Sequence, residues 1–130
     1  MTHALAVLIT SLLFGGMTLY SFGFAAFLFH ALPAAAAGTT LRKAFPWFYA
    51  FVIAAAGVAA TFWLWHDTVF AIVLATVAIT TVPARQLLMP AINRATDAGQ
   101  RQRFQWLHSL SVVVTLAHIG ATGWVLVTMA

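Results

Sequence analysis

The stretch that decides the fold is residues 104–130, FQWLHSLSVVVTLAHIGATGWVLVTMA. Polar residues recur in it at spacings of three and four, which place them on one face of a helix. These stripe residues are His108, Ser111, Thr115, His118 and Thr122. The positions between them are mostly apolar, and the stretch is long enough to cross a bilayer as a helix. We therefore predict a membrane-spanning helix with one polar face that is hydrated or paired.

The composition agrees with a membrane protein. Hydrophobic residues make up 63% of the chain and charged residues 6%, whereas a soluble domain carries about 25% charged residues. The pI near 10.9 comes from six basic side chains beside apolar segments, so it indicates membrane topology rather than a nucleic-acid partner. The chain has no cysteine, which excludes disulfides and thiol chemistry.

Four apolar segments are predicted to span the membrane, at about residues 4–32, 45–65, 69–92 and 104–129. Only residues 66–68 separate the second from the third, so these two should form an antiparallel hairpin, with Asp67 as the cap of the third. Residues 34–38 resemble a signal-peptide cleavage site, but the long apolar core and the lack of a basic leader favour a retained span. We predict a single all-α domain, residues 1–130, folded as an integral membrane four-helix bundle.

The basic residues predict the orientation of the bundle. Arg42 and Lys43 are expected in a loop between spans one and two, and the other four arginines at the end of span three or in an aqueous loop, residues 93–103. These two regions share one side, and the positive-inside rule makes that side cytoplasmic. Both termini should then lie outside the cytoplasm, and the expected location is a bacterial inner membrane.

Two stretches resemble the transmembrane protein 205-like family. Residues 27–51 read FLFHALPAAAAGTTLRKAFPWFYAF, and residues 85–111 end in an Arg-x-x-Phe-x-x-x-His-x-x-Ser signature. The signature falls on Arg101, Phe104, His108 and Ser111. The resemblance implies a four-helix fold in a family of largely unknown function, whose animal members are linked to platinum-drug tolerance. It also implies distant similarity to the copper resistance protein D type and to the membrane protoporphyrinogen oxidase that holds haem in such a bundle.

Three histidines are candidate ligands. His118 lies near the predicted midplane, where an ionisable side chain is by default a functional hypothesis. The alternative is that it only joins helices, through a hydrogen bond to Thr115, Thr122 or Tyr20. His30 and His108 share one predicted depth, and if spans one and four are neighbours they could hold a metal or haem b. For His108 the alternative is a bond to the preceding loop.

Arginines supply a second kind of candidate. Arg85 follows a long apolar run, so either its side chain reaches the interface or it pairs with Asp97 or an anionic ligand. Arg85 and Arg101 are the candidate contacts to an anion or a lipid headgroup. Asp97 and Gly99 have the composition of a turn.

No enzyme constellation emerges from the sequence. The chain has no glutamate, its two aspartates lie on predicted opposite sides of the membrane, and Ser109 and Ser111 near His108 lack an orienting acid. We therefore favour a non-enzymatic role, as accessory subunit of a membrane assembly or in handling a small ligand within the bundle. The expected partners are the lipid bilayer and another copy or a larger membrane complex, through small-residue faces at 15–23 and 54–60. The alternative is a haem- or metal-binding redox protein that uses histidines of spans one and four.

Overall fold

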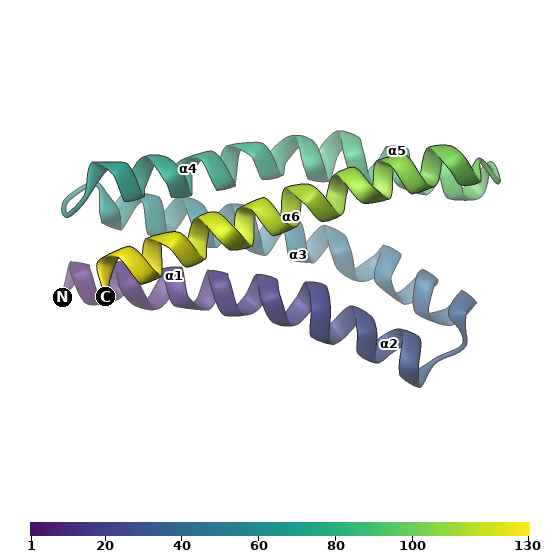
Figure 1. Ribbon diagram of the computed structural model, residues 1–130, viewed down its shortest axis with the longest axis horizontal. Coiled ribbons are helices and arrows are strands. Elements are labelled where there is room, and N and C mark those ends of the chain that lie inside the picture. Colours follow the sequence, from purple (N-terminus) through teal and green to yellow (C-terminus); the bar gives the residue numbers. More distant parts are fainter.

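The computed structural model describes residues 1–130 and is built entirely from helices (Figure 1). It has four antiparallel helical rods. The first contains α1 (Thr2–Thr18), the π-helical segment η1 (Leu19–Phe24) and α2 (Ala25–Ala31); the second is α3 (Ala34–Trp63); the third contains α4 (Thr68–Pro83), the π-helical segment η2 (Ala84–Leu88) and α5 (Met89–Asp97); the fourth is α6 (Arg101–Met129). Each rod is long and apolar enough to cross a membrane. The predicted all-α four-helix bundle is therefore confirmed.

Local chemistry explains the three turns. Leu32 is extended (φ −122°, ψ 155°), because the proline that follows it disfavours the helical region. Asp67 caps α4 by accepting hydrogen bonds from the backbone amides of Val69 (2.9 Å) and Phe70 (3.1 Å), so the predicted cap and hairpin are confirmed. Gly99 adopts a positive φ of 65° in the last turn, a conformation that glycine tolerates without steric cost.

Two expected loops are mostly helical, so those expectations are wrong. Arg42 and Lys43 lie within α3, and residues 93–97 belong to α5. The alanines at 34–37 favour helix, and no proline interrupts the chain between Pro33 and Pro46. A helix of 30 residues is about 45 Å long, which exceeds the roughly 30 Å of hydrocarbon in a bilayer. Charged residues can thus lie on the ends of these helices without a loop.

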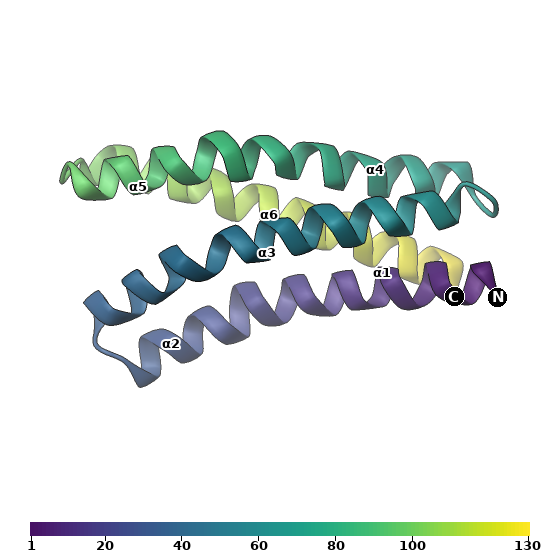
Figure 2. The same cartoon turned by 180° about the vertical axis from the view of Figure 1, so that it is seen from behind.

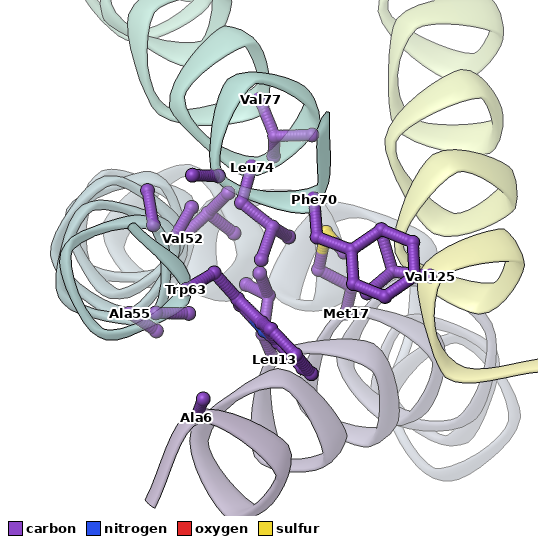
Figure 3. Close-up of a cluster of buried hydrophobic side chains, with 14 of the residues drawn as sticks. Ala6, Leu13, Met17, Val52, Ala55, Trp63, Phe70, Leu74, Val77 and Val125 are labelled. Atoms are coloured by element: carbon purple, nitrogen blue, oxygen red, sulfur yellow. The ribbon is translucent and has the colours of Figure 1, made fainter. Parts of the chain in front are cut away.

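The core lies in the half of the bundle that carries the termini, and Figure 3 shows its buried side chains. Trp63 of α3 is 2% exposed, and its indole Nε1 donates to Thr10 Oγ1 of α1 at 3.0 Å. Phe70 of α4 makes T-shaped contacts with Trp63 and with Trp124 of α6, at centroid distances of 5.0 and 5.7 Å. One aromatic cluster therefore joins all four rods.

The alanine-rich face of α3 packs inside this bundle. Its buried residues are Ala55, Ala56, Ala59 and Ala60. Small side chains let helices approach closely, and here they serve the packing of α3 against α1 and α4. The expectation that residues 54–60 contact a partner is therefore wrong for these four positions.

The two ends of the bundle differ. At the termini, Thr2 Oγ1 lies 3.0 Å from His66 Nε2, and the His3 ring makes T-shaped contacts with Trp63 and His66. At the opposite end, α2 and the first turns of α3 diverge from α5 and α6 (Figures 1 and 2). The bundle is closed at one end and splayed at the other, and all six basic residues belong to the half nearer the splayed end.

Candidate functional site

An apolar groove lies between the first rod and α3. It has a volume of about 390 Å³. Its lining residues are Gly16, Leu19, Tyr20 and Phe24 from the first rod and Trp47, Phe48 and Phe51 from α3. We refer to this site as the aromatic groove. Leu19 and Trp47 are 70% and 78% exposed, so the groove opens on the outer surface of the bundle.

The π-helical segment η1 supplies one wall of the aromatic groove. Tyr20 stacks on Phe48 at a centroid distance of 4.9 Å and an interplanar angle of 20°, and it also contacts Phe24 at 4.9 Å. Its hydroxyl donates to the backbone carbonyl of Ala44 at 3.0 Å. These contacts fix η1 against α3. Isolated π-helical turns often occur at functional sites, and this one lies directly at a groove.

Gly16 lies where α1 approaches α3 closely. A Cβ atom at this position would lie 2.7 Å from Cε1 of Phe51, which is far inside van der Waals contact. Because glycine has only a hydrogen at this position, the Phe51 ring can lie against α1 and line the groove. Gly15 next to it has nothing within 4 Å of the same hypothetical atom, so the close approach involves one of the two glycines.

The two basic residues near the aromatic groove differ, because one has an acidic partner and the other has none. Arg42 Nη2 lies 2.9 Å from Asp97 Oδ1, and this is the single salt bridge of the chain. The other acid, Asp67, caps α4 at the far end of the bundle. Lys43 is exposed and makes no salt bridge. A free positive charge therefore lies one helical turn before Trp47.

The polar stripe of α6 is paired at its C-terminal half. His118 Nε2 lies 2.8 Å from Thr80 Oγ1 of α4. The same hydroxyl is 2.7 Å from the Thr76 carbonyl, to which it donates its single proton, so the imidazole Nε2 is the donor toward Thr80. Thr122 donates to the backbone carbonyl of His118. His118 thus bridges α6 to α4, through a threonine that was not among its expected partners.

The other half of the stripe has no partner on another helix. His108 is exposed and stacks on Phe104 of its own helix at a centroid distance of 5.4 Å. Ser111 donates to the His108 carbonyl at 2.7 Å. Thr115 is partly exposed and has no side-chain hydrogen bond. The N-terminal half of α6 is therefore uncovered on this face.

His30 and His108 are not brought together. His30 is exposed on α2, and α2 diverges from the beginning of α6 (Figures 1 and 2). The close approach of spans one and four lies further along α6, where Gly123 packs against Phe14. Two axial ligands must face a common space, so this arrangement does not fit a metal or haem b held between the two histidines. No group of three or more ligating side chains occurs elsewhere in the chain.

The candidate arginines have different surroundings. Arg85 Nε donates to the Pro46 carbonyl at 3.2 Å, and its Nη1 donates to Gln86. The alternative in which Arg85 pairs with Asp97 is therefore wrong, because Asp97 binds Arg42. Arg101 is exposed and lines a second hollow, of about 210 Å³, at the turn between α5 and α6.

Comparison with known families places the chain. The model of a domain of unknown function, DUF4149, matches residues 8–101. The chain belongs to the DUF4149 family. No curated protein and no solved structure matches it. The region that matches the DUF4149 model contains every residue of the aromatic groove, but of α6 it contains only Arg101.

Sequence reasoning missed the aromatic groove. A signal was present in residues 43–51, where Lys43, Trp47 and Phe51 recur at a spacing of four and therefore share one helix face. That spacing gives a stripe on α3, but it does not say which rod faces it. The close approach of Gly16 to Phe51 joins residues of two rods and needed the structure.

Proposed function

We propose that this protein is a non-enzymatic, multi-pass membrane protein that binds the hydrocarbon chain of a bilayer amphiphile in the aromatic groove. The observation that carries this proposal is the groove itself. Its volume of about 390 Å³ lies within the range of small-molecule sites, about 300–1,000 Å³. Its wall from Gly16 to Phe24 covers roughly two helical turns of the first rod.

The polarity of the lining supports a hydrocarbon ligand. Tyr20 and Trp47 are the two lining residues with a polar side-chain atom. The hydroxyl of Tyr20 already donates to Ala44, and the indole of Trp47 is exposed, as is common for tryptophan at a membrane interface. A polar ligand would lose hydrogen bonds where it lies against this apolar lining. Methylene groups match the lining without that loss.

The lining also supports a binding role rather than catalysis. None of its seven residues is an acid, a histidine, a serine or a lysine. Both aspartates of the chain are engaged elsewhere, Asp67 as a helix cap and Asp97 in the salt bridge with Arg42. General acid–base or nucleophilic chemistry needs such groups within hydrogen-bond reach of the reacting atoms.

Native mass spectrometry of the detergent-purified protein tests this proposal. After incubation with phospholipid and exchange into fresh detergent, the parent should retain one lipid per chain. Leu19→Trp should lose it, because the larger side chain fills the groove. Leu12→Trp is the matched control, since Leu12 is an exposed leucine on the same rod outside the groove. Absence of a retained lipid in the parent, or equal retention by the two variants, would contradict the proposal.

A second candidate role is that of an accessory subunit in a membrane assembly, with α6 as the contact. Two residues of α6 are buried, Thr122 and Val125. Its exposed side chains include Trp106 and Val113 as well as His108. A photo-crosslinking residue at Val113 should then give one adduct of defined mass in native membranes, and the same residue at the exposed Ile72 of α4 should give none. Lipid adducts alone at both positions would contradict this role.

We also propose an orientation in the membrane and a set of family relationships for the chain. We propose a bacterial inner membrane as the location, with the half of the bundle that has all six basic residues on the cytoplasmic side and both termini outside; the positive-inside rule supports this orientation. The ordered motifs in residues 27–51 and 85–111 support a closer relationship to the transmembrane protein 205-like proteins and a distant one to the copper resistance protein D type.

A further inference from the structure

We propose that the ligand of the aromatic groove is an anionic phospholipid, whose phosphate binds Lys43 while one of its acyl chains lies along Trp47 and Phe51. This inference rests on the proposed function and names the class of amphiphile. It follows from three features of the described residues: the position of Lys43 on the helix, the distribution of acids in the chain, and the position of the groove relative to the membrane interface.

Lys43 lies on the face of α3 that carries the groove, one turn nearer the splayed end. Residues four apart in a helix lie on one face, with Cβ atoms about 5–6 Å apart. Lys43, Trp47 and Phe51 all lie within α3 and form such a series. Trp47 and Phe51 line the groove. Lys43 therefore lies on the same face as Trp47 and Phe51, one turn before Trp47 and closer to the splayed end of the bundle.

The acids of the chain leave this charge unneutralised. Two acids oppose six basic residues. Asp97 pairs with Arg42, which lies next to Lys43 in sequence, and Asp67 is at the opposite end of the bundle. Arg42 is thus already engaged, whereas Lys43 is available to a ligand. An ammonium and a phosphate oxygen form a charge-assisted hydrogen bond, which is stronger than a neutral one.

The position of the groove relative to the membrane interface favours a lipid over free phosphate or a second protein chain. An exposed tryptophan followed by a lysine one turn further out is typical of the zone where hydrocarbon meets headgroups. A phospholipid in this position has its phosphate at the level of Lys43 and its chain at the level of Phe51. Free phosphate would leave the apolar groove unfilled, and a helix of a second copy would require a longer surface than the seven residues that line it.

The test uses phosphatidylglycerol and phosphatidylcholine with identical acyl chains, mixed in equal amounts and offered to the full-length protein. Native mass spectrometry then gives the ratio of the two bound lipids. A lysine near an anionic headgroup contributes about 1 kcal/mol, which corresponds to about a fivefold preference. The parent should therefore show about a fivefold excess of bound phosphatidylglycerol.

Lys43→Gln should abolish this preference and still retain one lipid. Arg103→Gln is the matched control, because it removes one positive charge from the same half of the bundle at an exposed position on α6, away from the groove. It should keep the preference of the parent. An unchanged ratio in Lys43→Gln, or an equal loss in both variants, would overturn the inference. Retention of one lipid without headgroup preference in the parent would also overturn it and would leave the proposed function standing, whereas loss of all retained lipid in the parent would remove both.

Discussion

The indole nitrogen of Trp63 donates to the hydroxyl of Thr10 across 3.0 Å of the buried core. Both residues are almost fully buried, and Thr10 Oγ1 in turn donates to the Ala6 carbonyl at 2.6 Å. Association of helices in a membrane relies on van der Waals packing and interhelical hydrogen bonds. This bond is therefore one of the polar links between the first two rods.

Thr10→Val tests that link, because valine keeps the shape of threonine and removes the acceptor. The buried indole N–H is then unpaired, which costs about 1–3 kcal/mol in a protein interior. We expect a loss of about 1 kcal/mol in the free energy of unfolding in detergent. Thr61→Val is the control, since Thr61 is exposed and bonds only to the Gly57 carbonyl of its own helix. Equal stability of the two variants would show that the bond contributes nothing.

Gly16→Ala should change the aromatic groove without unfolding the protein. The added Cβ would lie 2.7 Å from the far edge of the Phe51 ring, and a ring edge can move more easily than backbone. We expect a loss of up to about 2 kcal/mol in stability, as for other overpacked sites, together with reduced retention of the phospholipid. Gly15→Ala meets no neighbour within 4 Å and should keep the lipid. Full retention by Gly16→Ala would contradict the assigned shape of the groove.

The bond between His118 and Thr80 is accessible to a double-mutant cycle. His118→Leu removes the donor and Thr80→Val removes the acceptor, so the cycle isolates the bond between them. Interhelical hydrogen bonds in membranes average about 0.6 kcal/mol, so we expect a coupling energy of that size from thermal unfolding. His108→Gln should leave stability unchanged, because His108 contacts only its own helix. A large loss of stability in His108→Gln would contradict the exposed position of His108 and its lack of contacts with other helices.

Reporter fusions check the orientation. A reporter that is active only in the cytoplasm should be silent after Ala130 and active when inserted at Ala98, which follows α5 in the turn before α6. The reason is the positive-inside rule applied to the half of the bundle that contains the six basic residues. Activity at Ala130 would reverse the assignment and would place Lys43 in the opposite leaflet.

Sequence reasoning succeeded where structure depends on neighbours along the chain. The four apolar spans, the hairpin at residues 66–68 and the Asp67 cap all follow from local pattern and chemistry. The loop around Arg42 was predicted wrongly because charge reports the position relative to the bilayer, whereas helix formation depends on the backbone. Both conditions are met by a helix that extends beyond the hydrocarbon.

The candidate site was less accessible to prediction, because it depends on which rods face each other. His118 was expected to join helices or act as a site, and its threonine partner on α4 could not be named from the sequence of α6. The groove required the pairing of Gly16 with Phe51, which are far apart in the chain. The pairing of His30 with His108 was conditional on spans one and four being neighbours, and equal depth does not fix lateral position in a bundle.

The contrast between the closed and splayed ends has a consequence for how a ligand would enter. Resistance of a region to local opening follows the density of its buried contacts. Thr10 and Trp63 lie where four rods interlock, whereas Leu28 is the single buried residue of α2. The backbone amides of α2 should therefore exchange with deuterium much sooner than those around Thr10. The proposed lipid would then enter and leave the groove from the side through small movements of α2, while the contacts around Thr10 and Trp63 hold the helices together.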